Sequence, residues 1–264
     1  PNINIPLLTL SEGDLQIPIS VQYNYSGFRP SDQPGWIGLG FSLIAGGVVS
    51  RHVKGFADEL TGFGFLSHPA AVANFANLTS PTYTSFQANI ENNNDVHADI
   101  YSFQFNGYSG KMVIDQNGVP KVVSDARIKI EYLIGTETDH GNSNQVIKKW
   151  TFTVENGTKY IFNNMEFTGN GGPDNDYVPS AWHLSEIVDI KGNRISFEYT
   201  APVISTAGRR IQYGRFDQDY AVTYRDGYGV ESSTVISQNK TEEIYLTKIK
   251  GSNWELVFNS ETYS

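Results

Sequence analysis

The side chains of this sequence that could do chemistry are its histidines and its acidic residues. Asp58 and Glu59 are adjacent and follow Gly55, and we expect them to fix a turn or to pair with Arg51 rather than to catalyse a reaction. The histidines show no HExxH or other metal-ligand spacing, so we assign them structural or surface roles and predict no metal site. They stand at positions His52, His68, His97, His140 and His183.

Two further acidic patterns leave alternatives open. Residues 169–176 (GNGGPDND) gather carboxylates and carbonyls that could hold Ca²⁺, but they lack EF-hand spacing, so a solvated loop is favoured and calcium binding stays open. Paired carboxylates for glycoside hydrolysis need a separation that no sequence gives, and we rank a secreted hydrolase last. Because GxSxG, Walker A and GxGxxG motifs are absent, we predict a protein that is not an enzyme and has no cofactor.

Some aromatic side chains could stack on sugars or dock a partner, although most are expected in the core or in cross-strand pairs. This possibility supports a second hypothesis, a surface adhesin or carbohydrate-binding module. The candidates are Trp150, Tyr177, Trp182, Tyr213, Tyr220, Tyr224 and Tyr228.

Composition excludes several classes of protein. The net charge of -9 argues against nucleic acid, because phosphate neutralisation needs clustered Lys and Arg. With no cysteine, neither a disulfide framework nor a thiolate metal site is available. No apolar run reaches the ~20 residues of a membrane helix, so no transmembrane span is expected. No signal peptide is visible at the first residues.

The pattern of elements is all-β. Residues 3–10 and 15–25 alternate as two strands around a turn, and Asn-Gly or Gly turns separate short strands from residue 100 onward. We predict an antiparallel hairpin meander that forms a β-sandwich or a strip of sheet, with one short helix at residues 70–78. Residues 201–241 could form a long decorated hairpin.

The chain is organised around residues 35–51, where glycines alternate with strand-forming residues. We expect a buried strand, a tight backbone crossing near residues 45–47, and a second strand that ends on an arginine. We predict that this stretch forms a structural nucleus together with the acidic residue at position 58. Its members are Gly35, Trp36, Gly38, Gly40, Phe41, Gly46, Gly47, Arg51 and Asp58.

The order of motifs resembles the N-terminal region of large secreted bacterial proteins of the RHS/YD-repeat family, which is related to the SpvB-like start of toxin-complex B components. The family more often has a second tryptophan where this chain has Phe41. A weak repeat, residues 182–199 and 245–258, resembles degenerate YD-type hairpins. The motifs are INIPL at 3–7, LQIPISVQYNYSG at 15–27, GWIGLGF at 35–41, GGVVSR at 46–51, FNGYSGK at 105–111, GTKYIF at 157–162 and WHLSEI at 182–187.

The resemblance implies a structural module that starts or caps the β-shell of a secreted or cell-surface protein, which can carry a C-terminal effector or toxin. It implies that the chain is a fragment whose partners are the rest of its own longer chain and a secretion or outer-membrane complex. We divide the chain into a Gly-rich β nucleus at residues 1–60, an irregular insertion at 61–99 and a β meander at 100–264, joined as one continuous unit.

Overall fold

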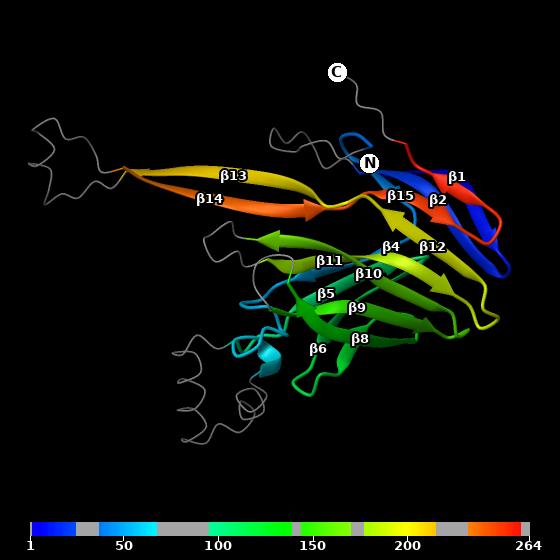
Figure 1. Cartoon of the computed structure of the whole chain (residues 1–264), viewed down its shortest axis with the longest axis horizontal. Helices are drawn as coiled ribbons and strands as arrows, with labels where there is room; N and C mark the ends of the chain where they lie inside the picture. The colour runs from blue at the N-terminus through cyan, green and yellow to red at the C-terminus, as the bar shows by residue number, and fades with distance from the viewer. Residues whose placement is uncertain are drawn as a thin grey trace, which may run out of the picture.

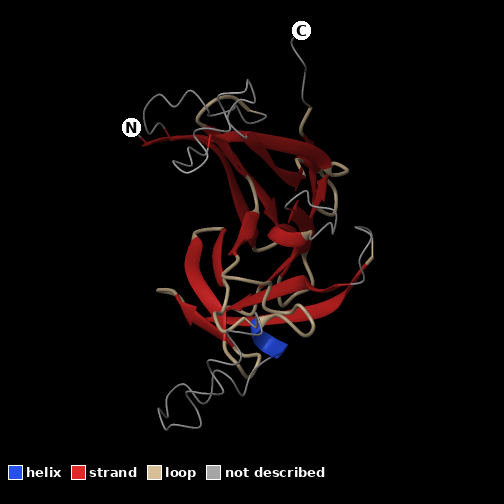
Figure 2. Cartoon of the chain, turned by 90° about the vertical axis from the view of Figure 1, so that its left-hand side faces the viewer, coloured by secondary structure: helices blue, strands red, loops and turns tan. Residues whose placement is uncertain are grey.

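The computed structural model describes residues 2–24, 37–67, 95–138, 144–169, 177–214 and 232–259, with the backbone alone for residues 204–214 and 232–240. Strands make up nearly all of the regular structure of this part, and Figure 2 shows the single short helical turn, η1 (Phe65–Ser67). The prediction of an all-β, antiparallel fold is confirmed. The helix expected at residues 70–78 lies outside the described residues.

The first sheet is small and has the order β1-β2-β3. Its strands are β1 (Asn2–Glu12), β2 (Leu15–Asn24) and β3 (Phe41–Ile44). Leu15, Ile17 and Ile19 alternate with exposed residues along β2 and are buried against the main core, as the sequence pattern predicted.

The second sheet has 13 strands, and its main path runs β13-β14-β10-β11-β4-β5-β6-β7. Off this path, β12, β15 and β16 extend from β11, while β9 and β8 extend from β10. The strands on the path other than the β13–β14 pair are β4 (Gly47–His52), β5 (Ile100–Phe105), β6 (Tyr108–Ile114), β7 (Pro120–Val123), β10 (Lys159–Gly169) and β11 (Val178–Val188). The branches are β8 (Ile128–Glu137), β9 (Asn144–Val154), β12 (Arg194–Tyr199), β15 (Leu246–Lys250) and β16 (Glu255–Val257).

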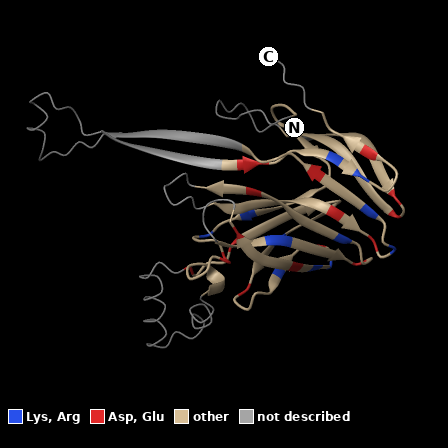
Figure 3. Ribbon diagram, in the orientation of Figure 1, with Lys and Arg blue, Asp and Glu red and all other residues tan. Residues whose placement is uncertain are grey.

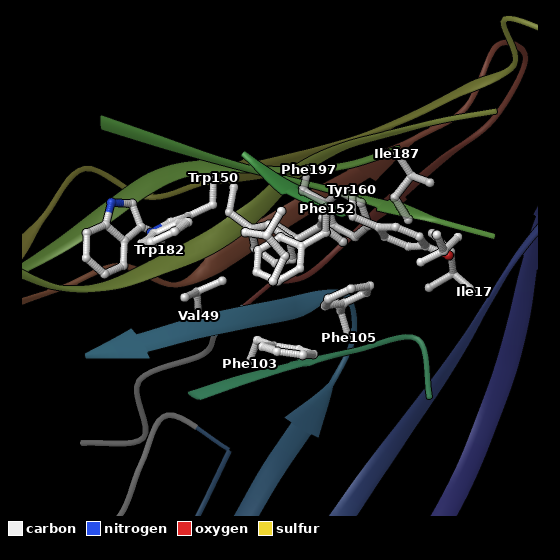
Figure 4. Packing of buried hydrophobic residues seen from close by; sticks show 14 of the residues in the cluster. Ile17, Val49, Phe103, Phe105, Trp150, Phe152, Tyr160, Trp182, Ile187 and Phe197 are labelled. Carbon is white, nitrogen blue, oxygen red and sulfur yellow. The ribbon is translucent and has the colours of Figure 1, made fainter. Parts of the chain in front are cut away.

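The long strand β10 changes partner along its length, which lets the sheet curl. Its first half pairs with β9 and its end pairs with β14, and its register with β11 shifts at three irregularities. Such bulges bend a strand and increase its twist. As a result, β4 and β5 face β9 and β10 across the core instead of continuing away from them (Figure 4).

Aromatic rings fill the space between these facing strands. The ring of Phe105 on β5 lies 5.2 Å from that of Phe152 on β9 and 4.6 Å from that of Tyr160 on β10. Trp150 and Trp182 are fully buried and meet edge to face at 5.9 Å. Each such pair adds about 0.5–1.5 kcal/mol beyond the area that it buries.

The bend at residues 45–46 carries the chain from the first sheet to the second. A Cβ atom on Gly47 would lie 2.3 Å from Phe105 Cβ, so only glycine allows β4 and β5 to approach this closely. The expected tight crossing is therefore present. The strand before it is not buried, however, because β3 is a surface strand in which Phe41 is 38% exposed.

A two-stranded ribbon, β13 (Val203–Gly214) and β14 (Ser232–Glu243), projects from the body (Figure 1). It corresponds to the long hairpin expected at residues 201–241. Residues 182–199 and 245–258 form the hairpins β11–β12 and β15–β16, which pair through β12 and β15. Their identity as YD-type repeats stays a prediction. No helix in the described ranges is long and apolar enough to cross a membrane.

Candidate functional site

Turns from four hairpins meet at one end of the curled sheet and enclose a polar cleft of about 450 Å³, which we call the hairpin cleft. It lies between the β1–β2 hairpin and the turns β5–β6, β9–β10 and β11–β12. Its lining consists of Asp14, Leu15, Gln16, Ile17, Asn106, Gly107, Tyr108, Asn156, Thr158, Tyr160, Ile187, Asp189, Ile190 and Lys191.

The turns owe their shapes to residues that tolerate positive φ or accept backbone hydrogen bonds. Asn106 and Gly107 have φ of 41° and 83°, the conformation of the tight β5–β6 turn. In the β11–β12 turn, Asp189 Oδ1 accepts hydrogen bonds from the backbone N–H groups of Lys191 at 2.8 Å and Asn193 at 2.9 Å. These contacts fix the turn that presents Lys191 to the cleft.

Opposite charges meet at the mouth of the cleft. Lys191 Nζ donates to Asp14 Oδ2 at 2.5 Å, although the two residues are 177 positions apart in the chain. Both side chains are more than half exposed, so the pair adds little stability and stays accessible to a ligand. Burial alone would raise the pKa of Asp189, but hydrogen bonds from Asn193, Lys191 and Gly192 outweigh it and lower that pKa. Asp189 is therefore ionised at neutral pH.

Two tyrosines form the inner wall of the cleft. The rings of Tyr108 and Tyr160 lie 6.2 Å apart in an edge-to-face arrangement, and Asn106 Nδ2 donates to the Tyr160 hydroxyl at 2.9 Å. Burial raises the pKa of Tyr160, which stays neutral. A wall of aromatic rings beside amide and carboxylate groups suits a ligand that has both apolar ring faces and hydroxyl groups, as sugars have.

A second group of charges is sealed inside the protein, around Arg51 on β4. Its guanidinium donates through Nε to Asp99 Oδ2 at 2.7 Å and through Nη1 and Nη2 to the two carboxylate oxygens of Glu59. The side chains of all three residues are fully buried. The guanidinium also lies 5.5 Å from the ring centroid of Tyr101, at cation–π distance. We call Arg51, Asp58, Glu59, Asp99 and Tyr101 the arginine cluster.

The cluster ties separate loops together through carboxylate oxygens. Asp58 Oδ1 accepts from the backbone N–H of Asp99 at 2.9 Å, and Asp99 Oδ2 accepts from that of Asp58 at 3.2 Å. Burial, followed by the neighbouring Asp99 carboxylate, raises the pKa of Asp58 to about 7. None of these residues lines the hairpin cleft or three other cavities of the described part of the chain. Arg51 therefore pairs with one of the two acidic residues at 58–59, Glu59.

The predicted nucleus is divided between several places. Gly35 and Trp36 lie outside the described residues. Gly38 and Gly40 precede β3, where the ring of Phe41 lies 4.7 Å from that of Tyr23. Gly46 lies in the bend between the sheets and Gly47 is the first residue of β4, while Arg51 and Asp58 lie in the arginine cluster.

The described histidines are His52, His97 and His183, and His97 is exposed in the loop before β5. His52 is exposed, and His183 Nε2 lies 3.1 Å from Glu166 Oε1 on the neighbouring strand. His68 and His140 lie outside the described residues, as do residues 170–176 of the possible calcium loop. Among the residues that the structure describes, no group of three or more His, Cys, Asp or Glu side chains could hold a metal ion.

Some of the aromatic candidates lie within the described residues and others lie outside them. Trp150, Trp182 and Tyr177 are buried, so the expectation of core packing holds for these three. Tyr220, Tyr224 and Tyr228, and the side chain of Tyr213, are outside the described part.

The sequence alone predicts no function for the residues of the hairpin cleft. Asn106-Gly107 and residues 11–14 are predicted only as turns. Each lining residue is of a type that is common in hairpin turns. One signal could have identified them: several of the turns contain a carboxylate or an amide together with a nearby aromatic residue. Their meeting in one cleft follows from strand pairings that the sequence does not reveal.

Comparison with known proteins gave one match to a family model, Metal-independent alpha-mannosidase (GH125), over residues 19–203. No curated protein matches the chain. This family match contradicts the prediction that the protein is not an enzyme. The prediction rested on missing sequence motifs, but the two carboxyl groups that cleave a glycosidic bond need no fixed spacing in sequence.

Three solved structures show weak similarity. The match to the TcdB2-TccC3 structure covers 95% of this chain and 10% of the other chain, with a TM-score of 0.38 and 11% sequence identity. The match to the Photorhabdus luminescens Tc holotoxin pore covers 100% of this chain and 10% of the other chain, with a TM-score of 0.41 and 11% sequence identity. The match to the N-terminal domain of the Salmonella typhimurium effector SpvB covers 99% of this chain and 66% of the other chain, with a TM-score of 0.36 and 12% sequence identity. TM-scores this low establish neither a shared fold nor a shared function.

Proposed function

The chain belongs to the family of metal-independent alpha-mannosidases, and on this premise we propose that it binds and hydrolyses α-linked mannosides at the hairpin cleft. The observation that carries the proposal is the meeting of two carboxyl groups, an exposed lysine and an aromatic wall in one polar cleft. All of the lining except residues 14–17 lies within the matched range of 19–203.

The two carboxyl groups of the cleft suit different roles. Glycoside hydrolysis without a metal uses a pair of carboxyl groups around a transition state in which positive charge develops on the sugar ring. Asp189 is ionised and fixed by its turn, so it supplies a negative charge of constant position. The side chain of Asp14 is 69% exposed and therefore accessible to a ligand, and we assign it to the glycosidic oxygen.

Substrate binding can be tested separately from hydrolysis. Isothermal titration of methyl α-mannoside into the protein should give a binding isotherm, and Asp14→Asn and Lys191→Met should each weaken it about tenfold, the cost of one charged hydrogen bond. Glu131→Gln and Lys129→Met are matched controls, because this pair is equally exposed but lies on β8, away from the cleft. Equal affinities in the cleft variants and in the controls would exclude the cleft as the binding site.

A second candidate function is that of a β-sheet module within a longer toxin-type protein, secreted or at a bacterial cell surface. It is favoured by the open edges of the sheets, since β1, β7, β8 and β16 each pair with a strand on one side only among the described strands. Edge strands present unpaired backbone N–H and C=O groups, with which another segment can pair. We propose that such a module starts or caps a strip of RHS-type sheet, with the division at residues 60 and 100 and the nucleus at residues 35–51 as its parts.

In this role the partners are the remainder of the same chain and a secretion or outer-membrane complex. The chain spans 10% of the length of the first two matched structures. An antibody against this segment tests the proposal on source cells and their medium. A band several times larger than 29.3 kDa, shed or surface-bound, supports the module. A band at 29.3 kDa contradicts it without affecting the proposed hydrolysis.

A further inference from the structure

A second cavity, of about 270 Å³, lies beside the bend that carries the chain between the two sheets, and we call it the bend cavity. Its walls come from both sheets and from residues 244–246. Most of the side chains around it are apolar, including Leu43, Ala45, Val48, Phe105 and Leu246.

The polar side chains at the bend cavity are largely committed to the protein. The Tyr199 hydroxyl donates to the carbonyl oxygen of Leu184 at 2.9 Å, and the Tyr245 hydroxyl donates to Glu243 Oε2 at 2.5 Å. His183 Nε2 lies 3.1 Å from the carboxylate of Glu166 but makes no hydrogen bond within the described part of the chain. A ligand in this cavity is therefore held mainly by apolar contact, because most of the lining side chains are apolar and the two tyrosine hydroxyls already have partners.

The bend cavity and the hairpin cleft are neighbours. Ile17, Asn106 and Gly107 line both, so the β5–β6 turn and one side chain of β2 form their common boundary. The hairpin cleft carries the charged side chains of Asp14, Asp189 and Lys191, whereas most of the side chains around the bend cavity are apolar. A single molecule with a polar head and an apolar tail can therefore occupy both sites.

We propose that the bend cavity binds the apolar aglycone of a mannoside whose sugar lies in the hairpin cleft, so that the preferred ligands are alkyl or similar apolar α-mannosides. This inference rests on the proposed function, which places the sugar. The geometry adds the class of aglycone. The small side chains at the bend are essential to the cavity, since Ala45 and Gly46 line it and larger residues there would fill it.

Titration of methyl, butyl and hexyl α-mannoside into the protein tests the inference. Each buried methylene should tighten binding about fourfold until the cavity is full. Equal affinities for the three compounds would overturn the aglycone site but leave the proposed function standing. Absence of binding by all three would overturn the proposed function and this inference together.

A variant locates the effect of the tail. Ala45→Leu should abolish the gain from the longer chains while methyl α-mannoside still binds with wild-type affinity. Ala201→Leu is the matched control, because Ala201 is exposed and does not line the cavity. A wild-type chain-length gain in the folded Ala45→Leu protein would contradict the assignment of the tail to this cavity. Folding of both variants is checked by urea denaturation.

Discussion

Arg51 and Glu59 form a fully buried ion pair in which both guanidinium Nη atoms donate to the two oxygens of one carboxylate. The same carboxylate accepts from the backbone N–H of Ile147 at 3.0 Å, which joins β4 and the loop after it to β9. Glu59 therefore has its hydrogen-bonding capacity used within the protein. Glu59 and Ile147 are 88 positions apart in the chain, so this carboxylate connects distant segments on facing parts of the curled sheet.

Replacing Arg51 by methionine should destabilise the protein strongly. The change leaves Glu59 and Asp99 buried without their partner, and removal of one member of a buried ion pair costs about 3–5 kcal/mol. Urea denaturation at pH 7 measures this loss. Arg194→Met is the control, because Arg194 forms an exposed pair with Glu186 and its loss should cost about 1 kcal/mol or less. Similar losses in the two variants would contradict the central role of the arginine cluster.

Asp58 should make the protein less stable as the pH rises from about 4 to about 7. Its pKa is about 7 in the folded protein against an ordinary value of 3.8, so over this range the folded state keeps a proton that the unfolded chain has lost. The free energy of unfolding therefore falls through this window, by on the order of 4 kcal/mol from this group, and is level above it.

Asp58→Asn removes this titration and keeps an oxygen that accepts from the Asp99 backbone N–H. The stability of the variant relative to the wild type should thus increase between pH 4 and pH 8, as measured by urea denaturation at one-unit steps. The other ionisable groups that interact with Asp58 are Arg51, Glu59, Asp99, Tyr101 and Tyr132, and they are unchanged in the variant. Parallel pH profiles for the two proteins would show that Asp58 is ionised in the folded state.

Gly47→Ala should cost about 1–3 kcal/mol, the usual penalty for overpacking. The added Cβ would lie 2.3 Å from Phe105 Cβ and 2.8 Å from the carbonyl oxygen of Gln104, so β4 and β5 must separate. Thermal unfolding measures the effect. Gly192→Ala provides the comparison, because it introduces only the strain of a φ of +87° and meets no atom within 4 Å. If Gly47→Ala is as stable as the wild type, the bend does not depend on close approach of the strands.

Local pairings could be predicted from the sequence because they depend on turns. Asn106-Gly107 and Asn156-Gly157 mark hairpins whose strands follow each other directly, and both hairpins are present. The pairing of β4 with β11 could not be predicted, since Val49 and Trp182 are far apart in the chain and nothing in either strand specifies the other. The curling of the sheet depends on bulges in β10, which leave no clear sequence signal.

The same distinction explains the two charged sites. Arg51 and Glu59 are close in sequence, so their pairing could be anticipated from the acidic residues that follow a glycine. Asp14 and Lys191 meet only because the β1–β2 hairpin lies against the β11–β12 turn. Along the described strands, Lys and Arg residues are interspersed with Asp and Glu residues (Figure 3).

Hydrolysis at the hairpin cleft is tested by measuring mannose release from α-linked mannobioses by the purified protein, with ¹H NMR as the readout. We expect turnover by the wild type without added metal, and a loss of about 10²-fold or more in kcat for Asp14→Asn, the range for a group that transfers protons. Glu131→Gln should retain wild-type turnover. A folded wild-type protein that releases no mannose from any mannobiose of the set would contradict the claim.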